Sequence, residues 1–284
     1  KKLIDTSDIE FLQDDLLDLK YESSSENKSE YKSEYNSEYK WEIKTKNSDS
    51  IYTKLLIGAD GANSFVRQKA KIDITSKNYE QMATVCTLKT QKPLQQCAWQ
   101  NFLTTGPLAY LPLDEHTASI VWSQDKVSYE ATKKLEDAVF EKIIAEKFNN
   151  KFGDVKLLSP RLAFPLIRSH AKTYVKDGLA LIGDAAHRAH PLAGQGANLG
   201  ILDTQALAQI IIKALNKSRD FNTHTWLKKY EQLRWLDNQN IMLSMSGFNS
   251  LFSNEDDFLM KLRNFGLSTF NKSSMFKRFC VMDR

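Results

Sequence analysis

A strand, a glycine-bearing loop and a helix follow one another between residues 179 and 214. Leu179 to Ile182 is a short apolar run, of the kind that forms a strand buried on both faces. From Gly196 onward, apolar residues recur at helical spacing. Asp184 stands where the strand ends, the usual place for a polar contact in an open α/β sheet. Because a helix N-terminus offers unpaired N–H groups and partial positive charge, this order predicts a site for a ligand with anionic character.

Residues 183–200, here called the Gly-Asp segment, carry glycines that let backbone approach a flat ring closely. Gly196, Ala197 and Asn198 are expected to present N–H groups at the start of a helix that ends near Asn216. Taken alone, the glycines also fit simple turn chemistry, and Asp184 also fits a helix cap or an ordinary loop carboxylate.

A second polar group follows Leu55 to Ile57, which is interpreted as another buried strand. Residues 58–67, here called the Asp-Gly motif, read Gly-Ala-Asp-Gly-Ala-Asn-Ser-Phe-Val-Arg. Residues from Ser64 to Lys71 are predicted to be helical. Asp60 and Arg67 could take part in binding, with Asp60 accepting backbone or hydroxyl donors, or could form a common surface ion pair.

Two other groups of side chains leave alternatives open. His187 and His190 have the spacing of a helical metal pair, but no third ligand follows in a familiar pattern, so we predict no metal site. Four aromatic residues suit either an aromatic substrate pocket or the core, with equal weight: Trp99, Phe102, Trp122 and Phe164.

The two motifs together resemble those of the FAD-dependent aromatic hydroxylases. The Gly-Asp segment is similar to the second flavin motif of that superfamily, and the Asp-Gly motif to its Asp-Gly fingerprint. Within the superfamily, the chain is most similar to the ubiquinone-biosynthesis hydroxylases. That similarity rests on residues 99–102, 106–107, 111–113 and 119–123.

The resemblance implies an enzyme that uses FAD, with NAD(P)H as electron donor and molecular oxygen as co-substrate. Such an enzyme hydroxylates the aromatic ring of a polyprenyl phenol or benzoquinol in ubiquinone biosynthesis, through a flavin C4a-hydroperoxide. It implies a place in a ubiquinone-biosynthesis protein complex and peripheral contact with a membrane. The expected location is cytoplasmic and peripheral on the inner membrane, on the matrix side in a eukaryote.

The resemblance also assigns roles to individual residues. Asp184 would hydrogen-bond the ribityl chain of FAD, and Pro191 would line the face of the flavin where oxygen reacts. The residues implied to be catalytic are Pro191, Gly194 and Gln195. The residues implied to bind the cofactor are Asp60, Gly61, Arg67, Gly183, Asp184, Gly194, Gly196, Ala197 and Asn198.

The expected fold is mixed α/β: an incomplete Rossmann-like FAD-binding domain with an inserted antiparallel sheet and C-terminal helices. Residues 1–75 would begin the FAD-binding domain, 76–168 would form the substrate-binding sheet, and 169–284 would complete the FAD-binding domain and add helices. The low-complexity stretch 22–40 is expected to be a loop. One amphipathic helix is predicted around residues 135–148, another from Thr223 into the 240s, and a third near 256–265.

The composition of the 284 residues excludes several classes of protein. A net charge of +4 does not favour nucleic acid as the main partner. The three cysteines have no paired spacing, which argues against a disulfide framework. No apolar run approaches the length of a membrane span.

A Gly-x-Gly-x-x-Gly motif is expected in this family about a hundred residues before the Asp-Gly fingerprint, and this sequence contains none. The sequence is therefore expected to be a fragment or a truncated gene product. Two alternatives to the hydroxylase remain: a degenerate, non-catalytic partner in a biosynthetic complex, and another flavin enzyme of the same fold. The Trp-x-Trp-x-Ile-Pro motif of the flavin-dependent halogenases is absent.

Overall fold

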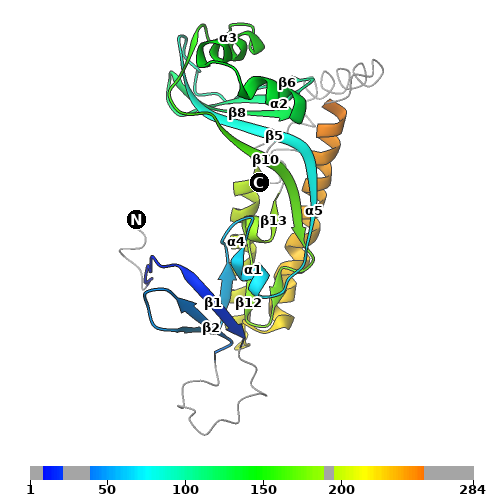
Figure 1. Ribbon diagram of the computed structural model, residues 1–284. Coiled ribbons are helices and arrows are strands. Elements are labelled where there is room, and N and C mark those ends of the chain that lie inside the picture. The colour runs from blue at the N-terminus through cyan, green and yellow to red at the C-terminus, as the bar shows by residue number, and fades with distance from the viewer. Residues whose placement is uncertain (1–8, 22–38, 189–194, 253–284) are drawn as a thin grey trace. The chain divides into compact units, whose positions relative to one another are not determined.

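The computed structural model describes residues 9–21, 39–188 and 195–252 (Figure 1). Contacts between residues divide the chain into two compact units. Unit 1 holds the described residues up to Ser76, residues 169–188, and the chain from 195 to 240. Unit 2 holds residues 77–168 and the remainder of the last described helix. The helix expected near 256–265 lies outside the described residues.

Unit 1 contains a three-stranded sheet in the order β11 (Val175–Lys176), β12 (Leu179–Leu181) and β4 (Leu56–Gly58). Strands β12 and β4 are parallel, whereas β11 and β12 form an antiparallel hairpin. The two strands expected before the motifs are therefore neighbours in one sheet. Their carboxyl ends point the same way.

A second sheet of unit 1 has the order β1 (Leu16–Tyr21), β2 (Trp41–Thr45) and β3 (Ile51–Thr53). All of its pairings are antiparallel. The hairpin of β2 and β3 confirms the strands predicted from alternating apolar and polar residues on either side of a turn.

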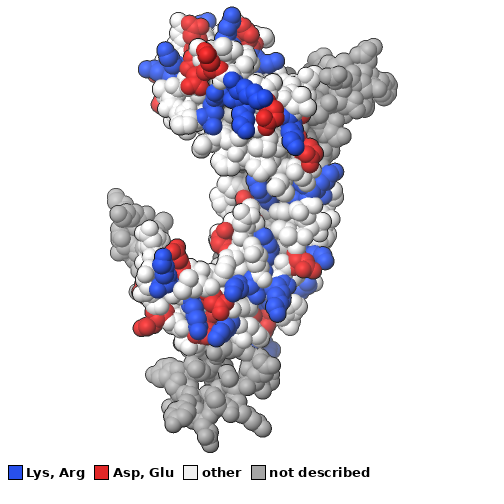
Figure 2. Space-filling model, in the orientation of Figure 1, with Lys and Arg blue, Asp and Glu red and all other residues white. Residues whose placement is uncertain are grey.

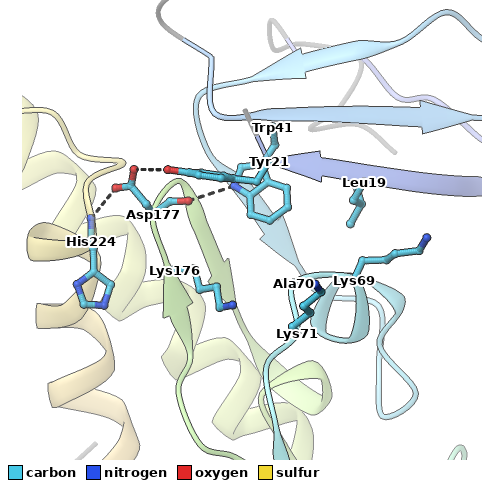
Figure 3. Close-up of a pocket in the computed structure, with 9 residues that line it drawn as sticks. All are labelled: Leu19, Tyr21, Trp41, Lys69, Ala70, Lys71, Lys176, Asp177 and His224. Atoms are coloured by element: carbon cyan, nitrogen blue, oxygen red, sulfur yellow. Dashed lines mark hydrogen bonds between the residues drawn. The ribbon is translucent and has the colours of Figure 1, made fainter. Parts of the chain in front are cut away.

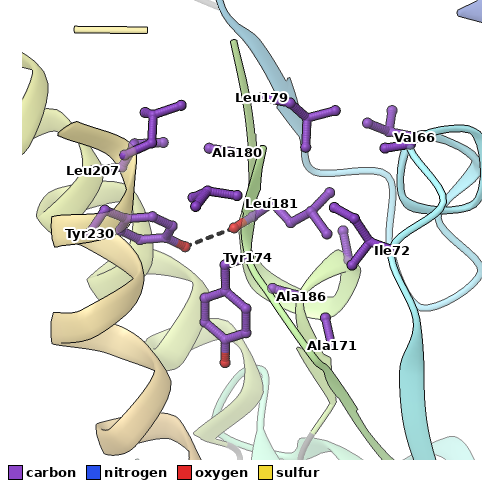
Figure 4. Close-up of a cluster of buried hydrophobic side chains, with 14 of the residues drawn as sticks. Val66, Ile72, Ala171, Tyr174, Leu179, Ala180, Leu181, Ala186, Leu207 and Tyr230 are labelled. Carbon is purple, nitrogen blue, oxygen red and sulfur yellow. Dashed lines mark hydrogen bonds between the residues drawn. The ribbon is translucent and has the colours of Figure 1, made fainter. Parts of the chain in front are cut away.

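Three helices complete unit 1: α1 (Phe65–Lys69), α4 (Gln195–Leu215) and the first part of α5 (His224–Phe252). All three were predicted, with small differences at their ends. The core of the unit surrounds β12, whose three residues are fully buried (Figure 4). Leu207 of α4 and Tyr230 of α5 pack on this core, and the Tyr230 hydroxyl donates to the Leu181 carbonyl at 2.8 Å.

Strand β4 is less buried than its apolar sequence predicts. Ile57 is 42% exposed, and Leu56 is half-buried. Among the described residues, β4 has β12 as its single neighbour and forms the edge of its sheet. A side chain on an edge strand is covered from fewer directions, so apolar composition alone overestimates its burial.

Unit 2 is built on antiparallel strands that confirm the sheet expected from residue 76 onward. Strands β10 (Leu162–Ala171), β5 (Ile74–Thr90), β8 (Thr117–Asp125), β7 (Gly106–Pro112) and β6 (Trp99–Leu103) follow one another in space. Strand β9 (Val155–Leu157) also pairs with β5. At the end of β10, within unit 1, the strand β13 (His187–Arg188) pairs with Ser169 and His170.

Within residues 77–168, unit 2 has two helices. Helix α3 (Asp137–Lys147) was predicted, and it buries Phe140 and Ile144 in a cluster with Ile120 and Trp122 of the sheet. Helix α2 (Lys126–Lys133) was not predicted, because it is only eight residues long and buries none of them. It is started instead by Asp125, whose carboxylate accepts from the Ser128 N–H at 2.8 Å.

Lysines and arginines are interspersed with acidic residues on the face drawn in Figure 2, in keeping with the small net charge. Among the helices within the described residues, none combines the length and apolarity needed to cross a bilayer.

Gly106 offers a test of the sheet in unit 2. It has φ of +127°, and a Cβ at this position would lie 2.3 Å from the Ser123 carbonyl oxygen. We expect Gly106→Ala to lower the unfolding free energy by about 1–3 kcal/mol or more. The substitution strains the left-handed backbone and adds a clash with the Ser123 carbonyl. Thermal unfolding followed by circular dichroism measures this.

The control for that measurement is Gly196→Ala, at a helical position where a Cβ meets no atom within 4 Å. Its unfolding midpoint should be unchanged or higher, since alanine favours helix. Equal midpoints for the two variants would contradict the packing described for Gly106.

Candidate functional site

The two motifs start from the carboxyl ends of adjacent parallel strands. Leu181 of β12 lies opposite Gly58 of β4, and the Ile182 N–H donates to the Gly58 carbonyl at 3.0 Å. The chain leaves β4 into the Asp-Gly motif and leaves β12 into the Gly-Asp segment. Ligands of open α/β sheets bind outside such carboxyl ends. The expected strand–loop order therefore brings the two motifs to one place.

The Asp-Gly motif turns the chain into α1. Ser64 is buried at the helix start, and its hydroxyl accepts from the Arg67 N–H at 2.9 Å. The Asp60 carboxylate accepts from the Val66 N–H at 3.0 Å, and the Gly61 carbonyl accepts from the Ser64 N–H at 3.0 Å. Asp60 is exposed, so its carboxylate faces solvent while it holds the helix start.

Arg67 joins the two motifs. Its buried guanidinium donates to the Ala62 carbonyl at 2.9 Å and to the Ala185 carbonyl at 2.7 Å. Burial lowers the pKa of Arg67, and the nearby Asp60 carboxylate opposes this shift. Among the ion pairs between described residues, none connects Arg67 to Asp60. In place of the surface ion pair considered from the sequence, the guanidinium makes one buried and one partly buried hydrogen bond to backbone carbonyls.

The Gly-Asp segment begins with a tight turn under α4. Gly183 has φ of +57°, a left-handed conformation that favours glycine. Helix α4 approaches this turn through Gly200, where a Cβ would lie 3.4 Å from the Gly183 Cα. Small residues at both positions let the helix pack directly on the turn.

Asp184 follows this turn and is exposed. No described residue engages its carboxylate, and the short 3₁₀ helix Gly183–Ala185 has Ile182, not Asp184, as its N-cap. The structure therefore does not support the helix-cap alternative, whereas an exposed loop carboxylate at the carboxyl end of β12 fits both the binding role and the simple loop reading.

The first turn of α4 supplies backbone donors. Gly196, Ala197 and Asn198 lie in this turn, as predicted, with Gly196 half-buried and the next two residues exposed. Gln195 is the first residue of the helix. Pro191 and Gly194, both predicted to be catalytic, lie outside the described residues.

A buried carboxylate that the sequence analysis missed lies beneath the Gly-Asp segment. Asp203 of α4 is fully buried, and its Oδ2 accepts from the Gly183 N–H at 3.0 Å and lies 2.5 Å from His187 Nε2. Its Oδ1 accepts from Arg234 Nε at 2.8 Å and from Asn238 Nδ2 at 3.1 Å. An ionised carboxylate can only accept, so Nε2 of His187 carries the proton in this pair.

The ionisation of Asp203 follows from these partners. Burial by itself raises the pKa of the carboxyl, but the hydrogen bonds and charges of His187, Arg234 and Asn238 outweigh burial and hold the pKa below its ordinary value of 3.8. Asp203 is thus an anion inside unit 1. The sequence signal was the four-residue spacing of Tyr230, Arg234 and Asn238, which places these polar groups on one face of α5.

Only one of the two histidines considered as a metal pair lies within the described residues. His187 pairs with Asp203, and His190 lies outside the described residues. Among the described residues, no group of three or more potential ligands surrounds a common point.

The four aromatic residues separate by environment. Trp122 is buried beside Phe140, and Trp99 is half-buried, packing against the same core with its ring 5.8 Å from that of Phe152. Phe102 and Phe164 are 45% and 48% exposed. Because Trp99 and Phe102 are three residues apart in one strand, they face opposite sides of the sheet.

Removing the buried carboxylate should destabilise unit 1. We expect Asp203→Ala to cost about 3–5 kcal/mol in unfolding free energy, because Arg234 then remains buried without its anion. Asp237→Ala is the matched control: Asp237 also bonds Arg234, at 3.0 Å, but it is exposed and should cost no more than about 1 kcal/mol. Urea unfolding at pH 7 distinguishes the two, and equal costs would contradict the network.

The same carboxylate predicts a dependence on pH. Since its pKa is lower in the folded state than in the unfolded chain, its contribution is complete well above pH 3.8 and disappears as pH falls through the folded pKa. Between pH 6 and pH 2, the unfolding free energy of the wild type should fall more than that of Asp203→Asn. If the unfolding free energies of the two proteins fall in parallel with pH, the lowered pKa of Asp203 is ruled out.

Comparison with known proteins agrees with this geometry. The family described as FAD binding domain matches residues 21–241. A 3-demethoxyubiquinol 3-hydroxylase of Escherichia coli (strain K12) is 38% identical over 237 residues, 84% of this chain and 60% of that protein. The human ubiquinone biosynthesis monooxygenase COQ6, mitochondrial, is 36% identical over 266 residues, 81% of this chain and 57% of that protein.

A solved structure shares the fold: the p-nitrophenol 4-monooxygenase PnpA of Pseudomonas putida DLL-E4. The match has a TM-score of 0.68 and 17% identity, and it covers 86% of this chain and 62% of the PnpA chain. The expected mixed α/β fold of the flavin monooxygenases is thereby confirmed. The chain spans little more than half the length of the curated relatives it matches. By its sequence match and by the two motifs at adjacent strand ends, the chain belongs to the FAD-binding domain family.

Proposed function

We propose that this chain is part of an FAD-dependent monooxygenase that hydroxylates the aromatic ring of a polyprenyl phenol or quinol in ubiquinone biosynthesis. The observation that carries the proposal is the meeting of the Asp-Gly motif and the Gly-Asp segment beside the first turn of α4. The names of the relatives, a demethoxyubiquinol hydroxylase and ubiquinone biosynthesis monooxygenases, supply the substrate class.

The residues in place fit FAD. Asp184 offers an accessible carboxylate that can accept hydrogen bonds from the hydroxyls of a ribityl chain. The N–H groups of Gly196, Ala197 and Asn198 suit the electron-rich pyrimidine edge of the flavin, which becomes more negative on reduction. When bound, FAD supplies the redox chemistry that takes electrons from NAD(P)H and activates molecular oxygen.

The remaining candidates have supporting roles in this proposal. Asp60 and Gly61 hold the start of α1 beside the cofactor, and Arg67 fixes the position of the Gly-Asp segment through Ala185. Gly183 makes the turn that presents Asp184. The resemblance alone carries the assignments of Pro191, Gly194 and Gln195 next to the flavin ring.

One face of the sheet in unit 2 suits the apolar part of the substrate. The register places Ala109, Val121 and Val85 side by side across β7, β8 and β5, on the face opposite the buried cluster of Trp122 and Ile120. All three are half-buried, and Phe102 lies on the same face. We assign this half-buried face to binding of the polyprenylated ring. The opposite face of the sheet packs in the core of the unit.

A polyprenylated substrate partitions into a bilayer, so the proposed enzyme acts at a membrane surface as a peripheral protein. Relatives of this chain are named as mitochondrial, and in a eukaryote we place the enzyme on the matrix side of the inner membrane. Membership in a ubiquinone-biosynthesis complex belongs to the same proposal.

Asp184 provides the test of cofactor binding. We expect Asp184→Ala to weaken FAD binding by about 10–150-fold through loss of a charged hydrogen bond, with an unchanged unfolding midpoint because the side chain is exposed. Asp220→Ala, an exposed aspartate between α4 and α5, is the control and should bind FAD normally. Fluorescence titration of FAD measures both. Equal affinity in the two variants would remove Asp184 from the site.

The activity itself is tested with the whole protein of which this chain is proposed to be part. Purified with FAD and supplied with NAD(P)H, oxygen and a prenylated phenol, it should form a product heavier by one oxygen atom. If the protein binds FAD but forms no such product from any of the ring-substituted prenyl phenols tested, that result would favour the non-catalytic alternative. The matched test of the substrate face is Ala109→Asp, which should abolish turnover while FAD binding persists.

A further inference from the structure

A pocket of about 620 Å³ lies in unit 1, at the opposite end of β12 from the Gly-Asp segment. Asp177 forms part of the turn that precedes β12, so the pocket opens at the amino end of this strand, away from the proposed flavin site. Its volume is that of a typical small-molecule site. The lining residues are Leu19, Tyr21, Trp41, Lys69, Ala70, Lys71, Lys176, Asp177 and His224 (Figure 3).

One wall of the pocket is aromatic and held in place. The rings of Tyr21 and Trp41 meet edge to face, with centroids 5.3 Å apart. The Tyr21 hydroxyl donates to Asp177 Oδ2 at 2.8 Å, and Trp41 Nε1 donates to the Asp177 carbonyl at 3.2 Å. Leu19, buried like Trp41, continues the wall. This surface is fixed without a ligand, which reduces the entropy lost on binding.

The acidic member of the pocket is already neutralised. Besides Tyr21, the Asp177 carboxylate binds the His224 N–H at 3.1 Å and Lys40 Nζ at 3.1 Å. Burial raises the pKa of Asp177, but these donors outweigh burial and lower it overall. Asp177 is therefore an anion whose charge is balanced by the Lys40 ammonium, which reduces its repulsion of a second anion.

Within the part of the chain that the structure describes, two of the pocket lysines have no acidic partner. Lys69 is paired with Asp18 at 2.6 Å, but the ammonium groups of Lys71 and Lys176 contact no acidic group among the described residues. Lys176 is half-buried, and Lys71 is exposed at the rim. Among the described lining residues, these two ammonium groups give the pocket an excess of positive charge beside a flat apolar wall.

We propose that this pocket binds a phosphomonoester whose organic part is planar or apolar. The two unpaired ammonium groups match the two charges of a phosphate monoester, and the Tyr21–Trp41 wall matches its body. Such a ligand can be a soluble phosphate ester or the phosphomonoester headgroup of phosphatidic acid. The site is independent of the proposed hydroxylation, since its test measures binding alone.

The experiment is calorimetric titration of the full chain, saturated with FAD so that the flavin site is not available to the probe. The probe is 1-naphthyl phosphate, compared with 1-naphthol and with inorganic phosphate. We expect one molar equivalent of the ester to bind, and each half-ligand to bind at least about tenfold more weakly, because each lacks one of the two contacts. Ester binding no tighter than that of either half would overturn the proposal.

The decisive variant is Lys71→Asn with Lys176→Gln, in which asparagine suits the left-handed backbone of Lys71. It should weaken ester binding by about tenfold or more. The control, Lys134→Gln with Lys217→Gln, removes the same charge from two exposed lysines outside the pocket and should change binding by less than about twofold. Equal effects of the two pairs would show nonspecific charge attraction and overturn the site.

Sedimentation with vesicles identifies the source of the phosphate. Binding to phosphatidylcholine vesicles that contain phosphatidic acid, lost in the Lys71/Lys176 variant, would assign the site to a lipid headgroup. Ester binding without vesicle binding would assign it to a soluble metabolite. If neither probe binds in a manner that depends on these lysines, the proposal is wrong.

Discussion

The buried carboxylate of Asp203 is the interaction on which the site depends. A lone anion in a protein interior is costly, and this one is tolerated because a guanidinium, an imidazole, an amide and a backbone N–H converge on it. These donors come from α5, β13 and the Gly183 turn. One side chain of α4 therefore fixes three separate segments, and Asp184 stands on the turn that it fixes.

Asp203 and Asp184 have different roles: Asp203 stabilises the fold, whereas Asp184 is left available for binding. Asp203 has its hydrogen-bonding capacity satisfied inside the unit, whereas Asp184, at the other end of the same turn, is free of described partners. The exposed carboxylate of Asp184 is thus not required for the packing of unit 1. The rigid scaffold beneath it limits the reorganisation that cofactor binding needs.

Sequence alone predicted what depends on local pattern. The strand–loop–helix around Asp184, the hairpin of β2 and β3 and the start of α1 follow from alternation, turn residues and spacing. It did not predict the partners of Asp203, because they lie up to 35 residues away and meet only after packing. The two-residue period of a strand could have separated Trp99 from Phe102, since their parity puts them on opposite faces. The edge position of β4, and so the exposure of Ile57, depends on topology that local pattern does not contain.

Arg67 has a consequence for how sequence variation in this family is interpreted. Its guanidinium links a carbonyl of one motif to a carbonyl of the other, so the backbone positions of the two cannot drift apart independently. A change of Arg67 would alter the site without removing any group that faces a ligand. In a genetic screen, such an allele would resemble a defect in a contact residue, although Arg67 acts through the two backbone carbonyls that it binds.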